Sequence, residues 1–163
     1  MGNYNSKKSY ILSFEDMEWI INNYISIKED IIIIHTLDTS HEDNIIKHTL
    51  NSQQETIRIN TILNTNKNTT ICIYGKNHTD EKVENKYNQL RELGFTNVFV
   101  YSGGLFEWLM LQELYGKEMF PTSTHSNSTK KEDDVLQYIL KNKPRSNLKY
   151  FKSIVNECDE FDY

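Results

Sequence analysis

The two cysteines, Cys72 and Cys158, are the strongest intrinsic nucleophiles in this chain of 163 residues. Cys72 lies inside the apolar run 71–73, a context in which a thiol is usually buried, inert and raised in pKa. Cys158 has acidic residues on both sides, and their charges disfavour the thiolate. Neither cysteine therefore has the context of an activated thiol, and both are predicted to be structural or incidental.

The residue types that bind metals show no ligand spacing. Neither cysteine belongs to a Cys-x-x-Cys or Cys/His pattern that holds zinc. The histidines also lack partner spacing: His35, His41, His48, His78 and His125. We therefore expect no metal, no cofactor and no disulfide framework, and this cysteine usage fits a reducing, intracellular compartment.

The N-terminus carries a candidate modification site. Residues 1–6 (MGNYNS) fit the pattern Met-Gly-x-x-x-Ser/Thr of N-myristoylated proteins, and Lys7 and Lys8 follow. Removal of Met1 would expose Gly2 for acylation in a eukaryotic host cell. Because one myristoyl chain binds membranes only weakly, on the order of 10⁴ M⁻¹, we expect transient or partner-assisted membrane association. The alternative is a chance match in an unmodified leader.

Composition and charge bound the class of protein. Hydrophobic residues make up 37% of the chain and charged residues 25%, which is enough for one core but not for a membrane bundle. The longest apolar run, 31–34, is too short to span a bilayer, and the N-terminus has no apolar signal segment. A net charge of -5 argues against sequence-independent binding of nucleic acid. These values predict one soluble globular domain with no nucleic-acid partner.

Strand and helix patterns alternate through the middle of the chain. Runs of β-branched and aromatic residues predict buried strands at 31–34, 69–74 and 97–101, with a short strand or extended piece at 45–50. Apolar residues at helical spacing predict helices at 13–24, 54–64, 80–93 and 105–115, with Ile57, Ile62 and Leu63 on the inner face of the second. Ser13 is expected to cap the first helix, and Asp80 or Thr79 the third. The alternation indicates an α/β domain with a mainly parallel central sheet flanked by helices.

The composition divides the chain into four segments. These are a flexible leader at 1–10, the α/β domain at 11–121, a linker at 122–133, and a C-terminal extension at 134–163. The extension contains two short helical patterns, at 134–140 and 148–155, before an acidic end. With its aromatic residues, it either binds a partner or folds back on the domain.

The segment from Ile71 to Trp108 resembles the rhodanese-like family. An apolar strand, a six-residue loop, a helix ending in Leu93-Gly94-Phe95 and a second strand are followed by Ser102-Gly103-Gly104, and Trp108 lies four residues after Gly104. The resemblance implies a three-layer rhodanese-like fold. It also implies sulfur transfer by a cysteine at the first loop position, whose thiolate or persulfide is held by backbone N–H groups at a helix N-terminus.

The string from Gly103 to Leu109 (GGLFEWL) is similar to a branch of rhodanese-like proteins encoded by giant viruses. The many Asn, Ile and Lys residues, with no alanine, are compatible with an AT-rich viral genome. This resemblance implies a viral protein in the host-cell cytoplasm, at the periphery of a membrane or in a virion.

This chain departs from the family pattern at two places. The nucleophile position is Gly75, and Asp-x-Arg after the first strand is replaced by His35-Thr36-Leu37. A Cys-x5-Arg phosphatase loop is excluded as well, because both its Cys and its Arg are absent. The resemblance therefore implies a catalytically inactive member with no catalytic residue.

The degenerate loop has two alternative roles. It consists of Gly75, Lys76, Asn77, His78, Thr79 and Asp80. Its backbone N–H groups, with Lys76 and His78, form a candidate anion-binding site. Alternatively, Asp80 caps the following helix and satisfies these donors itself, which is the favoured interpretation.

Three functional hypotheses follow. The leading one is a non-enzymatic rhodanese-like module that binds a protein partner and is lipid-anchored through Gly2. The second is a sulfurtransferase that uses Cys72 or Cys158, and the third is an anion sensor that uses the loop 75–80.

Overall fold

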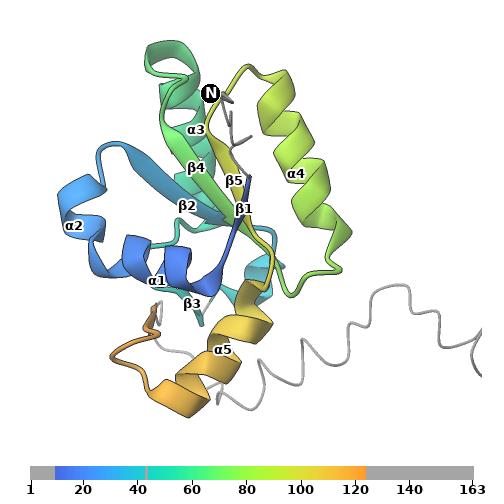
Figure 1. Ribbon diagram of the computed structural model, residues 1–163. Helices are drawn as coiled ribbons and strands as arrows, with labels where there is room; N and C mark the ends of the chain where they lie inside the picture. Colours follow the sequence, from blue (N-terminus) through green and yellow to red (C-terminus); the bar gives the residue numbers. More distant parts are fainter. Residues whose placement is uncertain (1–9, 43, 124–163) are drawn as a thin grey trace, which may run out of the picture.

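A parallel sheet of four strands forms the centre of the computed structural model, which describes residues 10–42 and 44–123 (Figure 1). The strands lie in the order β1 (Ile11–Leu12), β5 (Val98–Tyr101), β4 (Thr70–Tyr74) and β2 (Ile31–His35). All three pairings are parallel. The predicted α/β fold is confirmed, and β1 is a strand that the sequence pattern did not indicate.

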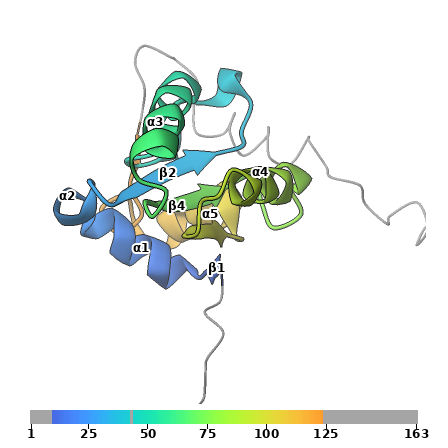
Figure 2. The same cartoon turned by 90° about the horizontal axis from the view of Figure 1, so that it is seen from above.

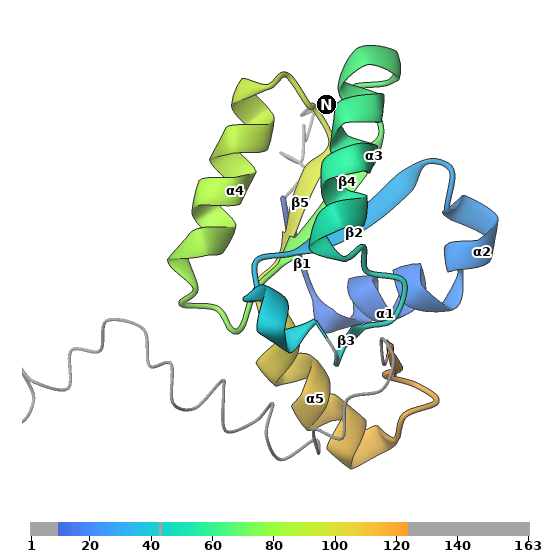
Figure 3. The ribbon, with the colours of Figure 1, turned by 180° about the vertical axis from the view of Figure 1, so that it is seen from behind.

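Helices cover both faces of the sheet, as the opposite views of Figures 1 and 3 show. One layer contains α1 (Phe14–Asn22), α2 (Tyr24–Ile27) and α5 (Gly104–Tyr115). The other contains α3 (Ser52–Thr65) and α4 (Glu81–Glu92). Seen from above, α3 and α1 lie on opposite sides of the strands (Figure 2). The three-layer arrangement therefore agrees with the sequence-based expectation.

Each central strand contributes side chains to both layers. In β2, Ile31 and Ile33 pack with α1 and α5, whereas Ile32 and Ile34 pack with α3 and α4. All five residues of β2 are buried. Because successive side chains of a strand point to opposite faces, a strand covered on both sides needs apolar residues at every position. This requirement explains the run of four isoleucines.

Local signals fix several helix ends. Ser13 forms a capping box with Asp16: its backbone N–H donates to Asp16 Oδ2 over 2.9 Å, and its Oγ accepts from Asp16 N over 3.2 Å. At the other end, the predicted helix 13–24 breaks at Asn23 into α1 and α2. Gly94 takes a φ of 94° after α4, a value that disfavours residues with a Cβ.

The structure corrects one expectation about the inner face of α3. Ile57 does not lie on the inner face of α3, because its side chain is 69% exposed. Ile62 is buried and Leu63 is half-buried, and Ile59 packs beside them. The residues 54–64 contain apolar side chains on more than one face, so spacing alone did not identify the buried one.

The first two residues of the predicted linker, Thr122 and Ser123, belong to a strand. Thr122–Ser123 form β6, which pairs antiparallel with β3 (Ile45–Ile46). Strand pairing uses backbone groups, so a polar pair such as Thr-Ser can extend a ladder. The remainder of the linker, the C-terminal extension at 134–163 and the leader up to residue 9 lie outside the described residues.

A buried tyrosine attaches β3 to the sheet. The hydroxyl of Tyr74 accepts a hydrogen bond from Ile46 N over 3.1 Å and lies 3.1 Å from Thr49 Oγ1. All three residues are buried. Because buried polar groups need partners, this hydroxyl holds the segment 45–49 against the end of β4.

We expect Tyr74→Phe to lower the free energy of unfolding by about 1–3 kcal/mol, because it leaves the buried N–H of Ile46 without its acceptor. Urea unfolding at neutral pH measures the change. Tyr115→Phe is the matched control, since Tyr115 is 61% exposed, and we expect it to unfold like the wild type. Equal stability of the two variants would contradict the assigned role of Tyr74.

Candidate functional site

Three chain segments meet where the central strands end. Thr36, Gly75 and Ser102 directly follow β2, β4 and β5. The register pairs His35 with Tyr74, and Tyr74 with Tyr101, so the three following residues lie side by side at one edge of the sheet. This carboxyl edge is where parallel α/β sheets usually place their ligands.

The loop 75–80 is fastened to the start of α5. Leu105 N donates to Gly75 O over 2.9 Å, and Phe106 N donates to Lys76 O over 2.8 Å. Gly104 takes a φ of 66°, and a Cβ at this position would lie 2.7 Å from Gly75 O. A side chain at Gly104 would therefore separate α5 from the loop.

The Asp80 carboxylate fills the inside of the loop. Its Oδ2 accepts from Lys76 N over 3.1 Å and from Thr36 Oγ1 over 3.2 Å. Its Oδ1 accepts from Lys82 N over 3.1 Å, which makes Asp80 the N-cap of α4. The predicted capping role of Asp80 is confirmed.

Two further N–H groups of the loop bond within the loop itself. Thr79 N donates to Asn77 Oδ1 over 3.1 Å, and Asp80 N donates to Asn77 O over 3.2 Å. Together with Lys76, three of the N–H groups that an anion would use already have partners.

The side chains of three residues crowd Gly75. A Cβ at this position would lie 2.4 Å from Asp80 Oδ2, 2.6 Å from Val83 Cγ2 and 2.8 Å from Thr36 Oγ1. Contacts this short require the surrounding atoms to move. The neighbours of Gly75 therefore occupy the volume that a larger residue would need.

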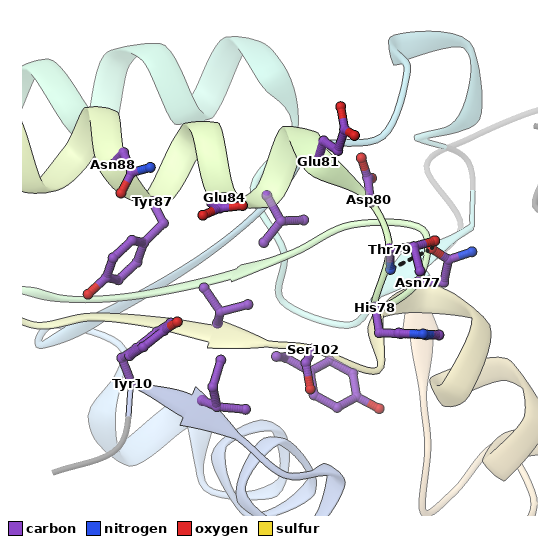
Figure 4. A pocket seen from close by; sticks show the side chains of 14 residues that line it. Tyr10, Asn77, His78, Thr79, Asp80, Glu81, Glu84, Tyr87, Asn88 and Ser102 are labelled. Atoms are coloured by element: carbon purple, nitrogen blue, oxygen red, sulfur yellow. Dashed lines mark hydrogen bonds between the residues drawn. The ribbon is translucent and has the colours of Figure 1, made fainter. Parts of the chain in front are cut away.

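A pocket of about 440 Å³ opens beside the loop, between α4 and the strands β1 and β5 (Figure 4). The rings of Tyr10 and Tyr87 lie 4.9 Å apart at its far end. Its carboxylates come from Asp80, Glu81 and Glu84, and its lining contains no Lys or Arg among the described residues. The pocket is therefore aromatic and acidic.

The other predicted site residues lie apart from this pocket or at its rim. His78 is exposed and lines the pocket, whereas the half-buried Lys76 does not line it. Cys72 is 1% exposed, and burial raises the pKa of its thiol to about 12, which confirms its structural role. Gly2 and Cys158 lie outside the described residues.

A buried histidine forms a polar cluster that sequence reasoning missed. His35 Nδ1 accepts from Leu37 N over 3.1 Å, which leaves the ring proton on Nε2. Nε2 lies 3.3 Å from Glu42 Oε1 without forming an aligned hydrogen bond. Glu42 in turn accepts from Ser52 N over 2.8 Å and from Ser52 Oγ. Spacing along the chain carried no signal for this cluster, because its members come from three separate segments.

Within residues 10–42 and 44–123, no three His, Cys, Asp or Glu side chains gather in a group that could hold a metal ion. In the same part of the chain, no helix has the length and apolar character needed to cross a membrane.

Comparisons with known proteins agree on one domain type. The family model described as "Rhodanese-like domain" matches residues 17–111. A solution structure of the rhodanese-like domain from the Alr3790 protein of Anabaena sp. is 20% identical, with a TM-score of 0.51 over 78% of this chain and 89% of that chain. No curated protein matches the chain.

A crystal structure of the same Anabaena sp. protein is 21% identical, with a TM-score of 0.49 over 69% of this chain and 91% of that chain. At 20% identity the solution structure supports the fold alone. The crystal structure, with a TM-score below 0.5, carries no argument.

The buried His35 predicts a pH-dependent stability. Burial lowers its pKa, and this effect outweighs the opposite effect of Glu42. Below about pH 6.5 the histidine of the unfolded chain binds a proton that folded His35 does not bind. The free energy of unfolding should therefore decrease as the pH is lowered, by up to about 1.4 kcal/mol per pH unit. The loss ends once the pH falls below the lowered pKa of the folded state.

Urea unfolding of the wild type and of His35→Asn between pH 7.5 and pH 5 measures this contribution. We expect the variant to show a smaller slope, and His78→Asn, which removes an exposed imidazole, to keep the wild-type slope. Identical slopes for the wild type and His35→Asn would contradict the assignment.

Proposed function

The chain belongs to the rhodanese-like domain family, and we propose that it acts as a catalytically inactive member, a module that binds a protein partner. The matched residues 17–111 include the loop 75–80. The observation that carries the proposal is the environment of Gly75, which stands at the nucleophile position of the family pattern. A hydrogen atom cannot accept sulfur, and a side chain there would require Asp80, Val83 and Thr36 to move.

The Asp80 carboxylate further opposes sulfur transfer. It already accepts the N–H of Lys76, and it lies 2.4 Å from where a Cβ at position 75 would be. A thiolate beside this carboxylate would be destabilised by its like charge. The loop therefore lacks the nucleophile and contains the Asp80 carboxylate beside the position of that nucleophile.

The alternative nucleophiles receive no support from their surroundings. Cys72 is buried with a pKa of about 12, so its thiolate is scarce at neutral pH. Cys158 has three acidic neighbours within two residues, which disfavour its thiolate.

An anion sensor is also disfavoured. The internal bonds of Asp80 and Asn77 use three N–H groups of the loop, and Glu81 and Glu84 add negative charge nearby. We propose that the loop 75–80 is structural and that the adjacent pocket faces the partner. Its tyrosine pair and carboxylates suit a Lys or Arg side chain of a peptide, through cation–π and ionic contacts.

We further propose that Gly2 is myristoylated, which gives the module weak membrane affinity in a host cell. The giant-virus branch and the location in host cytoplasm, at a membrane or in a virion, stay predictions from the sequence.

Sulfur transfer provides the direct test. After incubation with thiosulfate under non-reducing conditions, we expect the intact mass of the wild type to gain no sulfur, and addition of cyanide to give no thiocyanate. A sulfur adduct that a reductant removes would contradict the proposal, and Cys72→Ser and Cys158→Ser would locate it.

Restoring the nucleophile tests the role of Asp80. We expect Gly75→Cys to lose about 1–3 kcal/mol of stability, because its Cβ crowds Asp80, Val83 and Thr36. We also expect it to react slowly with iodoacetamide. Gly75→Cys/Asp80→Ala should react faster, since the carboxylate next to the thiol is gone. Equal reaction rates would show that Asp80 does not suppress a thiolate in this loop.

Acylation is tested separately. Co-expression with an N-myristoyltransferase should add one myristoyl group to the wild type and none to Gly2→Ala, as measured by intact mass. The acylated protein should then bind neutral vesicles weakly, with an affinity on the order of 10⁴ M⁻¹. An unmodified wild type would contradict the Gly2 assignment and leave the catalytic question untouched.

A further inference from the structure

Helix α5 is apolar on its outward face as well as on its inward face. Leu105, Trp108 and Leu109 are buried against the sheet. Phe106, Met110 and Leu114 follow each other at intervals of four residues and are 36%, 45% and 72% exposed. These three side chains form one stripe, which we call the outer stripe of α5. A helix that is apolar all round is normally covered on both sides.

Acidic residues flank the outer stripe. Glu107 and Glu113 stand three residues before and after Met110, which places them on either side of it along the helix. Lys117 and Glu118, of opposite charge, follow shortly after the helix. A segment that covers the stripe should therefore be apolar on one face and basic at its edges.

The described chain ends close to this helix. After α5 the backbone turns back, and Gln112 Nε2 donates to Phe120 O over 2.6 Å and to Thr122 Oγ1 over 3.4 Å. Trp108 Nε1 donates to Pro121 O over 3.2 Å. The chain therefore continues past Ser123 from a point anchored to α5, the gold helix of Figure 1.

The sequence that follows has the required character. Residues 135–155 contain no Asp or Glu and five basic residues: Lys141, Lys143, Arg145, Lys149 and Lys152. Apolar residues recur at helical spacing in two stretches: Leu136, Ile139 and Leu140, then Leu148, Phe151 and Val155. The twelve residues between Ser123 and Leu136 reach about 40 Å when extended, whereas α5 is about 18 Å long, so the whole stripe is within reach.

We propose that the outer stripe of α5 is the docking surface for the chain's own residues 135–155. The apolar side chains of this segment cover Phe106, Met110 and Leu114, and its basic residues face the flanking glutamates. Because the segment is tethered beside the helix, its effective concentration is in the millimolar range, and weak contacts suffice. The proposal is independent of whether the loop 75–80 is catalytic.

Paramagnetic relaxation in the full chain tests the docking. A nitroxide reagent should label Cys158, three residues beyond the segment, because Cys72 is buried with a pKa of about 12. We expect the methyl signals of Met110 and Leu114 to lose most of their intensity, whereas Ile57, exposed on α3 in the opposite layer, keeps its intensity. Cys158→Ser should show no loss anywhere.

Matched variants test the contact itself. The double variant Met110→Glu/Leu114→Glu should abolish the intensity loss of the Phe106 backbone amide signal. Ile57→Glu, which replaces an exposed residue of α3, should preserve that loss. Intensity losses at the stripe that do not change with protein concentration support the proposal. Absence of any loss at the stripe, or losses confined to Tyr87 and Asn88 of the pocket, would overturn it. Losses that grow with concentration would overturn it in favour of a second copy of the chain.

Discussion

The Asp80 carboxylate joins the three segments on which the site depends. It accepts hydrogen bonds from Thr36 after β2, from Lys76 after β4 and from Lys82 in the first turn of α4. A carboxylate at a helix N-terminus is stabilised by the helix dipole and by the N–H groups that it caps. One short side chain thus closes the loop and aligns α4 with two strand ends.

In the proposed inactive module, the Asp80 carboxylate occupies the loop that would otherwise bind an anion. A loop of converging N–H groups has an affinity for negative charge, and the chain supplies that charge itself. The loop is then a rigid border of the neighbouring pocket. Other residues of the pocket remain available to contact a partner. Tyr10 directly precedes β1, and Glu84 and Tyr87 belong to α4. Recognition would therefore move from the loop to the sides of the cleft.

The sequence predicted those features that arise from residues close together in the chain. Four consecutive isoleucines indicate a strand covered on both faces, and Ser13, Asp80 and Gly94 mark helix ends by local hydrogen bonds and a positive φ. Features that depend on distant segments were missed. The pairing of Thr122 with Ile46 and the cluster of His35, Glu42 and Ser52 leave no periodic signal. The predicted inward position of Ile57 was wrong, because several faces of α3 carry apolar residues.

The close contact at Gly104 has a consequence for reading protein families. Its positive φ and its approach to Gly75 O are needed for α5 to meet the loop, whatever residue stands at position 75. Gly104 in this turn is thus an architectural requirement and not a signature of turnover. Selection for a folded scaffold alone would retain it. If activity were assigned from this turn alone, sulfur transfer would be assigned to chains that have the fold but lack the catalytic cysteine.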